Sequence, residues 1–349
     1  MKQRNSPTSG SVTLRDVALA AGVSQATASR VLNGSTRRVI DVYRMRVLAA
    51  ADRLGYTANL SAQATARGMS SIIALMVADI ADPYFGQIAS GVARGADEVG
   101  LVVTIAVAER DSDREAALVR TLRGMRPTGL ILAASRGSHP VPALQHELEA
   151  YTATGGTVVM IGPGSGEYRS VPLDNYGGAR ALGEVLAGLG YRSAVIFGAA
   201  SGVRSSDDRI AGFESGFTSS GGAVGPVYRQ GFTRLNGYSL MRQALADGLQ
   251  PGTLVFGASD MVAVGAMAAL RENGRHVGDD IALAGYDDTA TGRDVTPALT
   301  TVSIPLEEVG YQALRAAVDQ DWTPQAANIG YEVVLRDSTP VPKTVGAAR

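Results

Sequence analysis

Five residues near the N-terminus are spaced to share one face of a short helix. They are Gln25, Ala26, Ser29, Arg30 and Asn33, and helical periodicity over residues 25–33 brings them to the same side. Their amide, hydroxyl and guanidinium groups donate and accept hydrogen bonds, which suits recognition of a polar partner. The opposite face carries apolar side chains, at Ala28, Val31 and Leu32. The pattern predicts a helix with a buried side and a small polar recognition face.

The residues before this helix predict a second helix and a tight turn. Thr13 is expected to cap a helix over residues 14–20, with Asp16 in the position of a capping box. Gly22 lies where the turn needs a residue that tolerates positive φ, and Ser24 is expected to cap the following helix. Two short helices joined in this way are the elements of a helix-turn-helix.

A third helix is predicted over residues 41–54, with Asp41 as its N-cap. It is expected to pack against the first two helices through Val42, Val47, Leu48, Ala51 and Leu54. An ordinary three-helix bundle without a role in DNA binding is the alternative that this pattern leaves open.

The charge distribution favours a polyanionic partner for the N-terminal part. Residues 1–67 contain ten basic and three acidic side chains, a net charge of +7, whereas the remainder has a net charge of −8. A basic head on an acidic body indicates a polyanionic partner for the head only. A solvated, charged N-terminal domain without such a partner is the alternative.

The sequence has no constellation that would support catalysis or metal binding. The absence of cysteine excludes disulfides, thiolate zinc sites and cysteine nucleophiles. Three scattered histidines lack metal-ligand spacing, there is no G-x-S-x-G elbow, and the glycine-rich run at 162–166 lacks the following helix and Lys-Ser/Thr pair of a phosphate loop. We expect neither enzymatic activity nor a cofactor. Since no targeting or membrane-spanning stretch is visible, we expect a cytoplasmic protein that associates with the nucleoid when bound to DNA.

The rest of the chain alternates short apolar runs with amphipathic stretches. Strands are expected at 72–77, 101–107, 130–134, 158–161, 194–197, 254–256 and 281–284. Helices are expected at 85–99, 114–125, 176–189, 208–218, 238–246 and 260–273. The apolar runs indicate parallel strands covered on both faces. Because about 270 residues exceed one ordinary sheet, two α/β lobes with a ligand cleft between them are predicted.

Long motifs resemble the LacI/GalR repressor family over residues 13–336. They include TLRDVALAAGVSQATASRVLNG at 13–34, LAAADRLGYTAN at 48–59, ADIADPYF at 78–85, VPLDNYGGAR at 171–180, SSDDRIAGF at 205–213 and GYDD at 285–288. The resemblance implies an all-α helix-turn-helix headpiece and a two-lobed α/β effector domain of the periplasmic-binding-protein type. It also implies a homodimer that binds palindromic double-stranded DNA. No leucine heptad for a tetramer is present in the tail.

The resemblance also implies roles for individual residues of the headpiece. Gln25 and Ala26 are expected to face base edges in the major groove, and Arg30 to reach a guanine edge. Contacts mainly to phosphates are expected from Ser24, Thr27, Ser29, Asn33 and Arg44.

The linker after the headpiece departs from the family pattern. Asn59 and Gln63 fit the pattern and are expected to contact the minor groove or its phosphates, but the family usually has Pro in place of Ala58 and Leu in place of Thr65. Because threonine is a short and polar wedge, we expect a weaker DNA kink than the family produces. A flexible linker that becomes ordered only on DNA is the alternative.

In the body, the resemblance assigns effector contacts to Tyr84 and Phe85 in the first lobe and Phe232 in the second, and hydrogen bonds to ligand hydroxyls to Arg209, Asp260 and Asp287. The alternative is that the aromatic residues belong to the core and the carboxylates cap helices or turns.

These inferences give a complete expected organisation. Residues 1–12 form a disordered N-terminus, 13–58 the DNA-binding domain, 59–70 the hinge, 71–338 the effector-binding and dimerisation domain, and 339–349 a tail. Lobe one is expected at about 71–170 and 300–324, and lobe two at about 171–299 and 325–338. The expected function is repression of carbohydrate uptake or catabolism genes, controlled by a sugar-like effector. A sugar-binding transport receptor and a purine-responsive or co-repressor-dependent regulator are the alternatives.

Overall fold

The computed structural model describes residues 12–32, 39–57, 70–133, 141–162 and 167–342. The chain divides into two compact units, Met1–Ser70 and Ser71–Arg349. In the described part of the chain, no helix is both long enough and apolar enough to cross a membrane.

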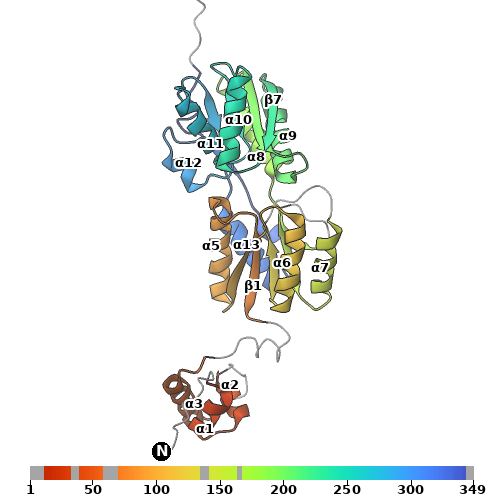
Figure 1. The fold of residues 1–349 in the computed structure, drawn as a ribbon, viewed down its shortest axis with the longest axis vertical. Coiled ribbons are helices and arrows are strands. Elements are labelled where there is room, and N and C mark those ends of the chain that lie inside the picture. The colour runs from red at the N-terminus through yellow and green to blue at the C-terminus, as the bar shows by residue number, and fades with distance from the viewer. Residues whose placement is uncertain (1–11, 33–38, 58–69, 134–140, 163–166, 343–349) are drawn as a thin grey trace, which may run out of the picture. The chain divides into compact units, whose positions relative to one another are not determined.

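Among its described residues, the first unit contains the helices α1 (Leu14–Ala21), α2 (Gln25–Leu32) and α3 (Asp41–Leu54) (Figure 1). The predicted capping box is confirmed, because Asp16 N donates to Thr13 Oγ1 at 3.3 Å and Thr13 N donates to Asp16 Oδ2 at 2.9 Å. Gly22 ends α1 with φ of 64°, as the turn requires. A small core holds the helices together; its buried members are Val17, Ala18, Ala21, Ala28, Val47, Ala50 and Ala51.

The predicted packing of α3 was partly wrong. Val42 is 58% exposed and Leu48 is 46% exposed, while Ala50 is buried in their stead. The N-cap position belongs to Ile40, and Asp41 is the first helical residue. Because α3 carries apolar residues around much of its circumference, periodicity alone did not distinguish its buried face.

The first lobe of the second unit is a parallel sheet with the strand order β2-β1-β3-β4-β5. Its strands are β1 (Ile72–Val77), β2 (Val102–Val107), β3 (Gly129–Leu132), β4 (Thr157–Ile161) and β5 (Arg169–Val171). Its helices are α5 (Pro83–Glu98), α6 (Ser112–Gly124), α7 (Pro142–Thr152) and α13 (Leu306–Val318).

Strand β1 shows how the sequence positions the two helical layers. Ile73, Leu75 and Val77 belong to the core with α5 and α13, whereas Ala74 and Met76 belong to the core with α6 and α7. Alternating side chains of a strand point to opposite faces, so one apolar run supplies both cores. Strand β2 differs from the prediction, because it lies at the edge and is only partly covered.

The second lobe is a parallel sheet with the order β7-β6-β8-β9. Its strands are β6 (Ser193–Ala199), β7 (Ala223–Gln230), β8 (Leu254–Gly257) and β9 (Ala282–Ala284). Its main helices are α8 (Asn175–Gly188), α9 (Arg204–Ser219), α10 (Arg234–Ala246) and α11 (Asp260–Glu272), with the short α12 (Ala290–Asp294) after β9. Ile196 packs in the core with α8 and α9, and Val195 and Phe197 pack in the core with α10 and α11.

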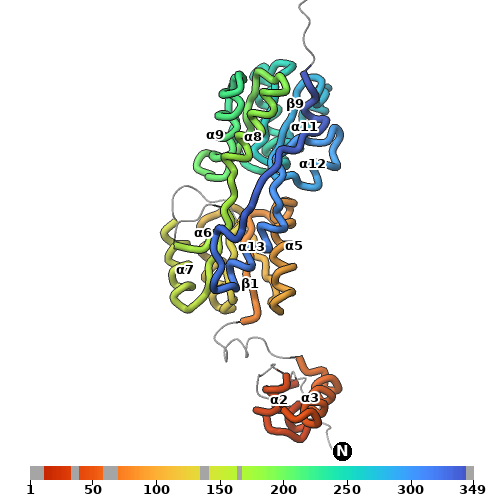
Figure 2. Tube along the Cα trace, turned by 180° about the vertical axis from the view of Figure 1, so that it is seen from behind, coloured from red at the N-terminus to blue at the C-terminus, as the bar shows by residue number. Residues whose placement is uncertain are grey.

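The chain passes between the lobes three times, as the tube in Figure 2 shows. One passage leads from β5 to α8. The other two contain β10 (Thr301–Ser303) and β11 (Glu332–Val334), which pair antiparallel, with α14 (Pro324–Ala327) between them in sequence. The last passage ends in the second lobe, where Ser338 Oγ donates to Leu283 O at 2.6 Å. These crossings place the carboxyl ends of strands from both sheets toward the same region.

Candidate functional site

The polar face of α2 is accessible and is fixed by a cap. Ser24 Oγ accepts a hydrogen bond from Thr27 N at 3.1 Å and lies 2.9 Å from Thr27 Oγ1, so both hydroxyls are held at the helix start. Gln25, Ala26 and Arg30 are exposed. The structure therefore brings a short amide, methyl and guanidinium ridge to the surface of the headpiece.

Other predicted DNA contacts have mixed surroundings. Arg44 on α3 is exposed, while Thr27 and Ser29 are half-buried. Asn33, Asn59, Gln63 and the hinge residue Thr65 lie outside the described residues. Their predicted roles stay predictions.

A buried arginine of the second lobe contacts side chains and backbone from several elements of that lobe. Arg209 on α9 donates from Nε to Asn175 Oδ1 at 2.8 Å and from Nη1 to Ala258 O at 2.8 Å. Its Nη2 lies 2.8 Å from Asp287 Oδ1, and its guanidinium carbon lies 3.9 Å from the centroid of the Tyr286 ring. Each of the three nitrogens makes one of these contacts, which fixes the side chain and leaves one further N–H on each of Nη1 and Nη2.

Asp287 is held in an unusual backbone conformation opposite Arg209. Its φ is 109°, and that of Asp288 is 54°. Asp287 N donates to Val302 O at 2.9 Å, so the crossing strand β10 fixes this turn. Burial raises the pKa of the Asp287 carboxyl, and the nearby Arg209 guanidinium opposes that shift. Positive φ at two consecutive non-glycine residues is strained and is typical of functional sites.

Asp260 makes its hydrogen bonds within the protein. Its Oδ2 accepts from Thr289 N at 2.6 Å and from Thr289 Oγ1 at 3.1 Å, and its Oδ1 accepts from Thr301 Oγ1 at 2.6 Å. The side chain is fully buried at the start of α11. Asp260 therefore ties α11 to the 287–289 turn and to β10, which positions Asp287.

The burial of Asp260 gives a testable dependence on pH. Burial raises the pKa of this carboxyl to about 7, although hydrogen bonds from Thr301 and Thr289 lower it. The folded protein then binds a proton that the unfolded chain, with a carboxyl pKa of about 4, has released, so the free energy of unfolding falls as the pH rises from about 4 to 7.

We expect Asp260→Asn to remove this dependence. Relative to the variant, the wild type should lose up to about 4 kcal/mol of stability as the pH rises through this window. Urea unfolding at several pH values between 4 and 8 measures the difference. Parallel stability curves for the two proteins would show that Asp260 does not titrate in this range.

The first lobe contributes a second wall. Tyr84 is half-buried, and its ring packs edge-on against Phe85 with the centroids 5.0 Å apart. Burial raises the pKa of the Tyr84 hydroxyl, and so does the charge of Asp287 in the other lobe. Phe85 is buried in the core of its own lobe. Tyr84 thus lies at the site together with Arg209 and Asp287, whereas Phe85 packs against the Tyr84 ring from the core of the first lobe.

Several residues at this site were not among the residues predicted from the sequence. Asp82 caps α5, with Tyr84 N donating to its Oδ1 at 3.0 Å, and Asn175 begins α8. Arg110 lies 4.8 Å from the centroid of the Phe232 ring in the other lobe. Asn175 and Asp82 lie in the motifs at 171–180 and 78–85, which offered a signal; Arg110 lies outside them.

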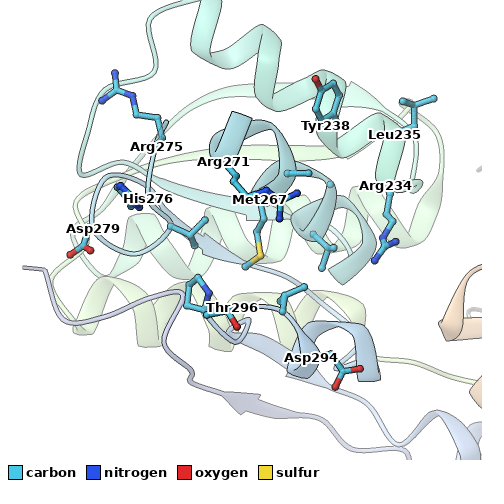
Figure 3. Close-up of a pocket in the computed structure, with 16 residues that line it drawn as sticks. Arg234, Leu235, Tyr238, Met267, Arg271, Arg275, His276, Asp279, Asp294 and Thr296 are labelled. Carbon is cyan, nitrogen blue, oxygen red and sulfur yellow. The ribbon is translucent and has the colours of Figure 1, made fainter. Parts of the chain in front are cut away.

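A separate groove lies on the second lobe between α10, α11 and the segment after α12. Its volume is about 1010 Å³, and Met267 points toward Thr296 across it (Figure 3). Arg234, Arg271 and Arg275 line it together with Asp279 and Asp294. It does not include any of the predicted effector residues. No cluster of potential metal ligands occurs in the residues that the structure describes.

Comparison with known proteins identifies the family. Residues 13–59 match the bacterial regulatory proteins of the lacI family, and residues 184–339 match a periplasmic binding protein-like domain. The regulator GalS of Salmonella typhimurium is 32% identical over 88% of this chain and 89% of its own length. The chain belongs to the LacI family.

Two solved structures of the LacI family extend the comparison. The lac repressor dimer bound to operator and the anti-inducer ONPF has a TM-score of 0.79 at 27% identity, covering 95% of this chain and 99% of its own. The complex of the regulator CelR with cellobiose has a TM-score of 0.65 at 27% identity, covering 94% and 99%.

These matches confirm the predicted family and the predicted fold class, a helix-turn-helix headpiece followed by a two-lobed α/β domain. The predicted function as a DNA-binding transcriptional regulator is confirmed as well. The curated relatives are transcriptional regulators and not enzymes.

Proposed function

We propose that this LacI-family regulator is a repressor of carbohydrate uptake or catabolism genes that responds to a sugar-like effector bound between the two lobes. The observation that carries the proposal is the combination, in one chain, of an exposed recognition ridge on α2 with the Arg209–Asp287 pair at 2.8 Å facing Tyr84 of the other lobe. The first feature suits base edges, and the second suits vicinal hydroxyl groups.

On operator DNA, Gln25 and Ala26 read base edges and Arg30 reaches a guanine. Ser24, Thr27, Ser29, Asn33 and Arg44 contact phosphates, and Asn59 and Gln63 contact the minor groove or its phosphates. The exposure of Gln25, Ala26 and Arg30 supports this arrangement. A regulator of this kind acts in the cytoplasm, on the nucleoid.

In the cleft, we assign direct effector contacts to Tyr84, Arg209, Asp287 and Phe232. Asp260 and Phe85 belong to the same site, where their burial suits them to hold Asp287 and Tyr84 in place. The cellobiose complex of CelR supports a carbohydrate. A purine is the second candidate, since a PurR repressor of Erwinia tasmaniensis is 31% identical over 88% of this chain.

The domain boundaries that we propose are those expected from the sequence, with 13–58 as the DNA-binding domain, 59–70 as the hinge and 71–338 as the effector domain.

Asp288 provides a physical link between the cleft and the groove. It lies 2.7 Å from Arg293 of α12 and 2.6 Å from Arg336 of the last crossing. Asp288 thus connects the turn that carries Asp287 to α12, whose last residue, Asp294, lines the groove.

The groove is the surface that we propose for contact with a second copy of the chain. Its arginines and aspartates are self-complementary, and Leu235 on α10 is 73% exposed beside them. The dimer in the lac repressor structure supports a homodimer, whose two-fold symmetry matches a palindromic operator.

We expect Leu235→Asp to weaken the dimer by about ten- to a hundredfold, because it replaces an apolar contact by a carboxylate that must be desolvated. Analytical ultracentrifugation over a concentration series measures the effect. Met125→Asp, at a side chain that is 46% exposed at the end of α6 in the other lobe, is the control. An unchanged dissociation constant for Leu235→Asp would place the interface elsewhere.

The proposed function is tested by incubating the purified protein with fragmented genomic DNA of its host and sequencing the retained fragments, with and without candidate sugars. A palindromic motif near sugar-uptake or catabolic genes is the expected result. If no motif is enriched under any condition, the proposed repressor function is wrong.

A further inference from the structure

The charged groups of the cleft differ in whether other groups of the protein form ion pairs or hydrogen bonds with them. Arg209 and Asp287 are paired at 2.8 Å, and both oxygens of Asp260 accept hydrogen bonds. Arg110 is different. Within the residues that the structure describes, its guanidinium makes no hydrogen bond and no ion pair, and its only direct partner is the ring of Phe232 at 4.8 Å.

The turn that carries Arg110 fixes its direction. Glu109 and Arg110, which follow β2, have φ values of 55° and 60°. Glu109 does not neutralise Arg110, since its carboxylate lies 3.1 Å from Arg114 Nη1 on α6. Arg114 is itself anchored, with Nε donating to Val107 O at 3.1 Å. The strained turn thus separates the side chains of Glu109 and Arg110, and the Arg110 guanidinium lies at the cleft.

The surroundings of Arg110 are protein-rich although the side chain is exposed to solvent. Burial lowers the pKa of its guanidinium, while Asp82 and Asp79 act through space in the opposite direction. Neither carboxylate makes an ion pair with Arg110, and one oxygen of each accepts a backbone hydrogen bond, from Tyr84 N and Ala81 N respectively. Among the described residues, no acceptor pairs with the N–H donors of this cation.

Phe232 orients this cation. Phe232 is buried among Ala199, Ala258 and Val203 in the second lobe, and this packing holds its ring in place. A guanidinium stacked on an aromatic face keeps its N–H donors in the guanidinium plane, where they remain available to another partner. A planar fork of donors matches the two oxygens of a carboxylate or phosphate.

We propose that Arg110 is a specificity-determining residue and that the effector is an acidic carbohydrate, either a sugar acid or a sugar phosphate, whose anionic group binds the Arg110 guanidinium. The inference rests on the proposed function and narrows its effector class. The hydroxyl groups of the same ligand bind Arg209 and Asp287. Phe232 positions Arg110 in addition to its own contact with the effector.

Isothermal titration calorimetry with the full chain tests this inference. The probes are glucose, galactose and mannose, each compared with its aldonate and its 6-phosphate. We expect one acidic compound to bind at least about tenfold more tightly than its neutral parent, since a charged hydrogen bond is worth about 1.5–3 kcal/mol. Whether the aldonate or the phosphate is preferred distinguishes the two sources of the anion.

Variants then test whether Arg110 causes the preference for the acidic compound. Arg110→Gln should weaken the acidic compound by about 10- to 100-fold and the neutral parent by no more than about threefold. Arg110→Lys, which keeps the charge and loses the fork, should fall between Arg110→Gln and the wild type. Arg94→Gln is the matched control, because Arg94 also lies 4.8 Å from an aromatic centroid, that of Tyr311 on α13.

The outcomes separate the inference from the function on which it rests. Neutral sugars that bind as tightly as their acidic forms, or an acidic preference that survives in Arg110→Gln, would overturn the role of Arg110 and leave a sugar-responsive regulator intact. If no compound of either kind binds, the acidic-carbohydrate inference and the sugar effector both fail. Selection of operator DNA would still test the regulator by itself.

Discussion

Replacing Arg209 by methionine should lower the free energy of unfolding of the effector domain by about 3–5 kcal/mol. The variant leaves the buried carboxylate of Asp287 without its cation, and it leaves Asn175 Oδ1 and Ala258 O without their donors. A buried charge or acceptor that loses its partner costs more than the net contribution of the original pair. Urea unfolding followed by fluorescence of the single tryptophan, Trp322, measures the loss.

Two further variants distinguish this explanation from a general loss of packing. Adding Asp287→Asn to Arg209→Met should recover part of the lost stability, because the uncompensated charge is then removed. Arg180→Met is the matched control on a neighbouring helix, since Arg180 pairs with Glu184 at 2.9 Å on the surface. We expect a change of no more than about 1 kcal/mol there. Equal losses in the Arg209 and Arg180 variants would contradict the account of the buried pair.

The double variant Gln25→Ala, Arg30→Ala should lose about 30- to 10,000-fold in affinity for operator DNA. Both side chains are exposed on α2, and a base contact of this kind contributes about 1–3 kcal/mol of discrimination. Non-specific binding, which depends on phosphate contacts, should change much less. Fluorescence anisotropy with a selected operator and with a scrambled duplex at the same salt concentration measures both.

The control for the headpiece variant replaces an arginine of α3 that is not among the predicted contacts. Arg53→Ala removes an exposed charge in the last turn of α3 and should weaken both duplexes to a similar, small extent. If the double variant loses affinity equally for operator and scrambled DNA, then α2 does not read base edges.

The sequence predicted the headpiece almost to the residue because its turns and caps are local. The Thr13 cap and the turn at Gly22 depend on neighbouring residues and were correct. The buried face of α3 depends on the packing of helices that are distant in sequence, and the exposed Val42 and Leu48 were therefore misplaced.

In the body, the apolar runs predicted the central strands, whereas the peripheral elements had no such signal. Strand β7 contains Pro226 and lies at the edge of its sheet, which is where proline is tolerated. Strands β10 and β11 are three residues long, and they form only because two interlobe crossings lie side by side. Such pairing cannot be read from the periodicity of either segment.

The effector site was predicted in part. Arg209 and Asp287 stood in motifs of the family, and the structure places them in contact. Arg110 meets Phe232 only because the two lobes face each other, across more than a hundred residues of sequence. The role of Asp260 changes for the same reason, since its partners Thr289 and Thr301 belong to other elements.

The most direct test of the central claim is the affinity of the protein for its selected operator with and without a saturating sugar that binds the cleft. Operator and effector bind the same protein, so each must change the affinity for the other by the same factor. The account predicts that a saturating sugar changes operator affinity by about 5- to 150-fold, and that operator changes sugar affinity by the same factor. An operator affinity that stays the same at saturating sugar would contradict an effector-controlled regulator, whichever sugar occupies the cleft.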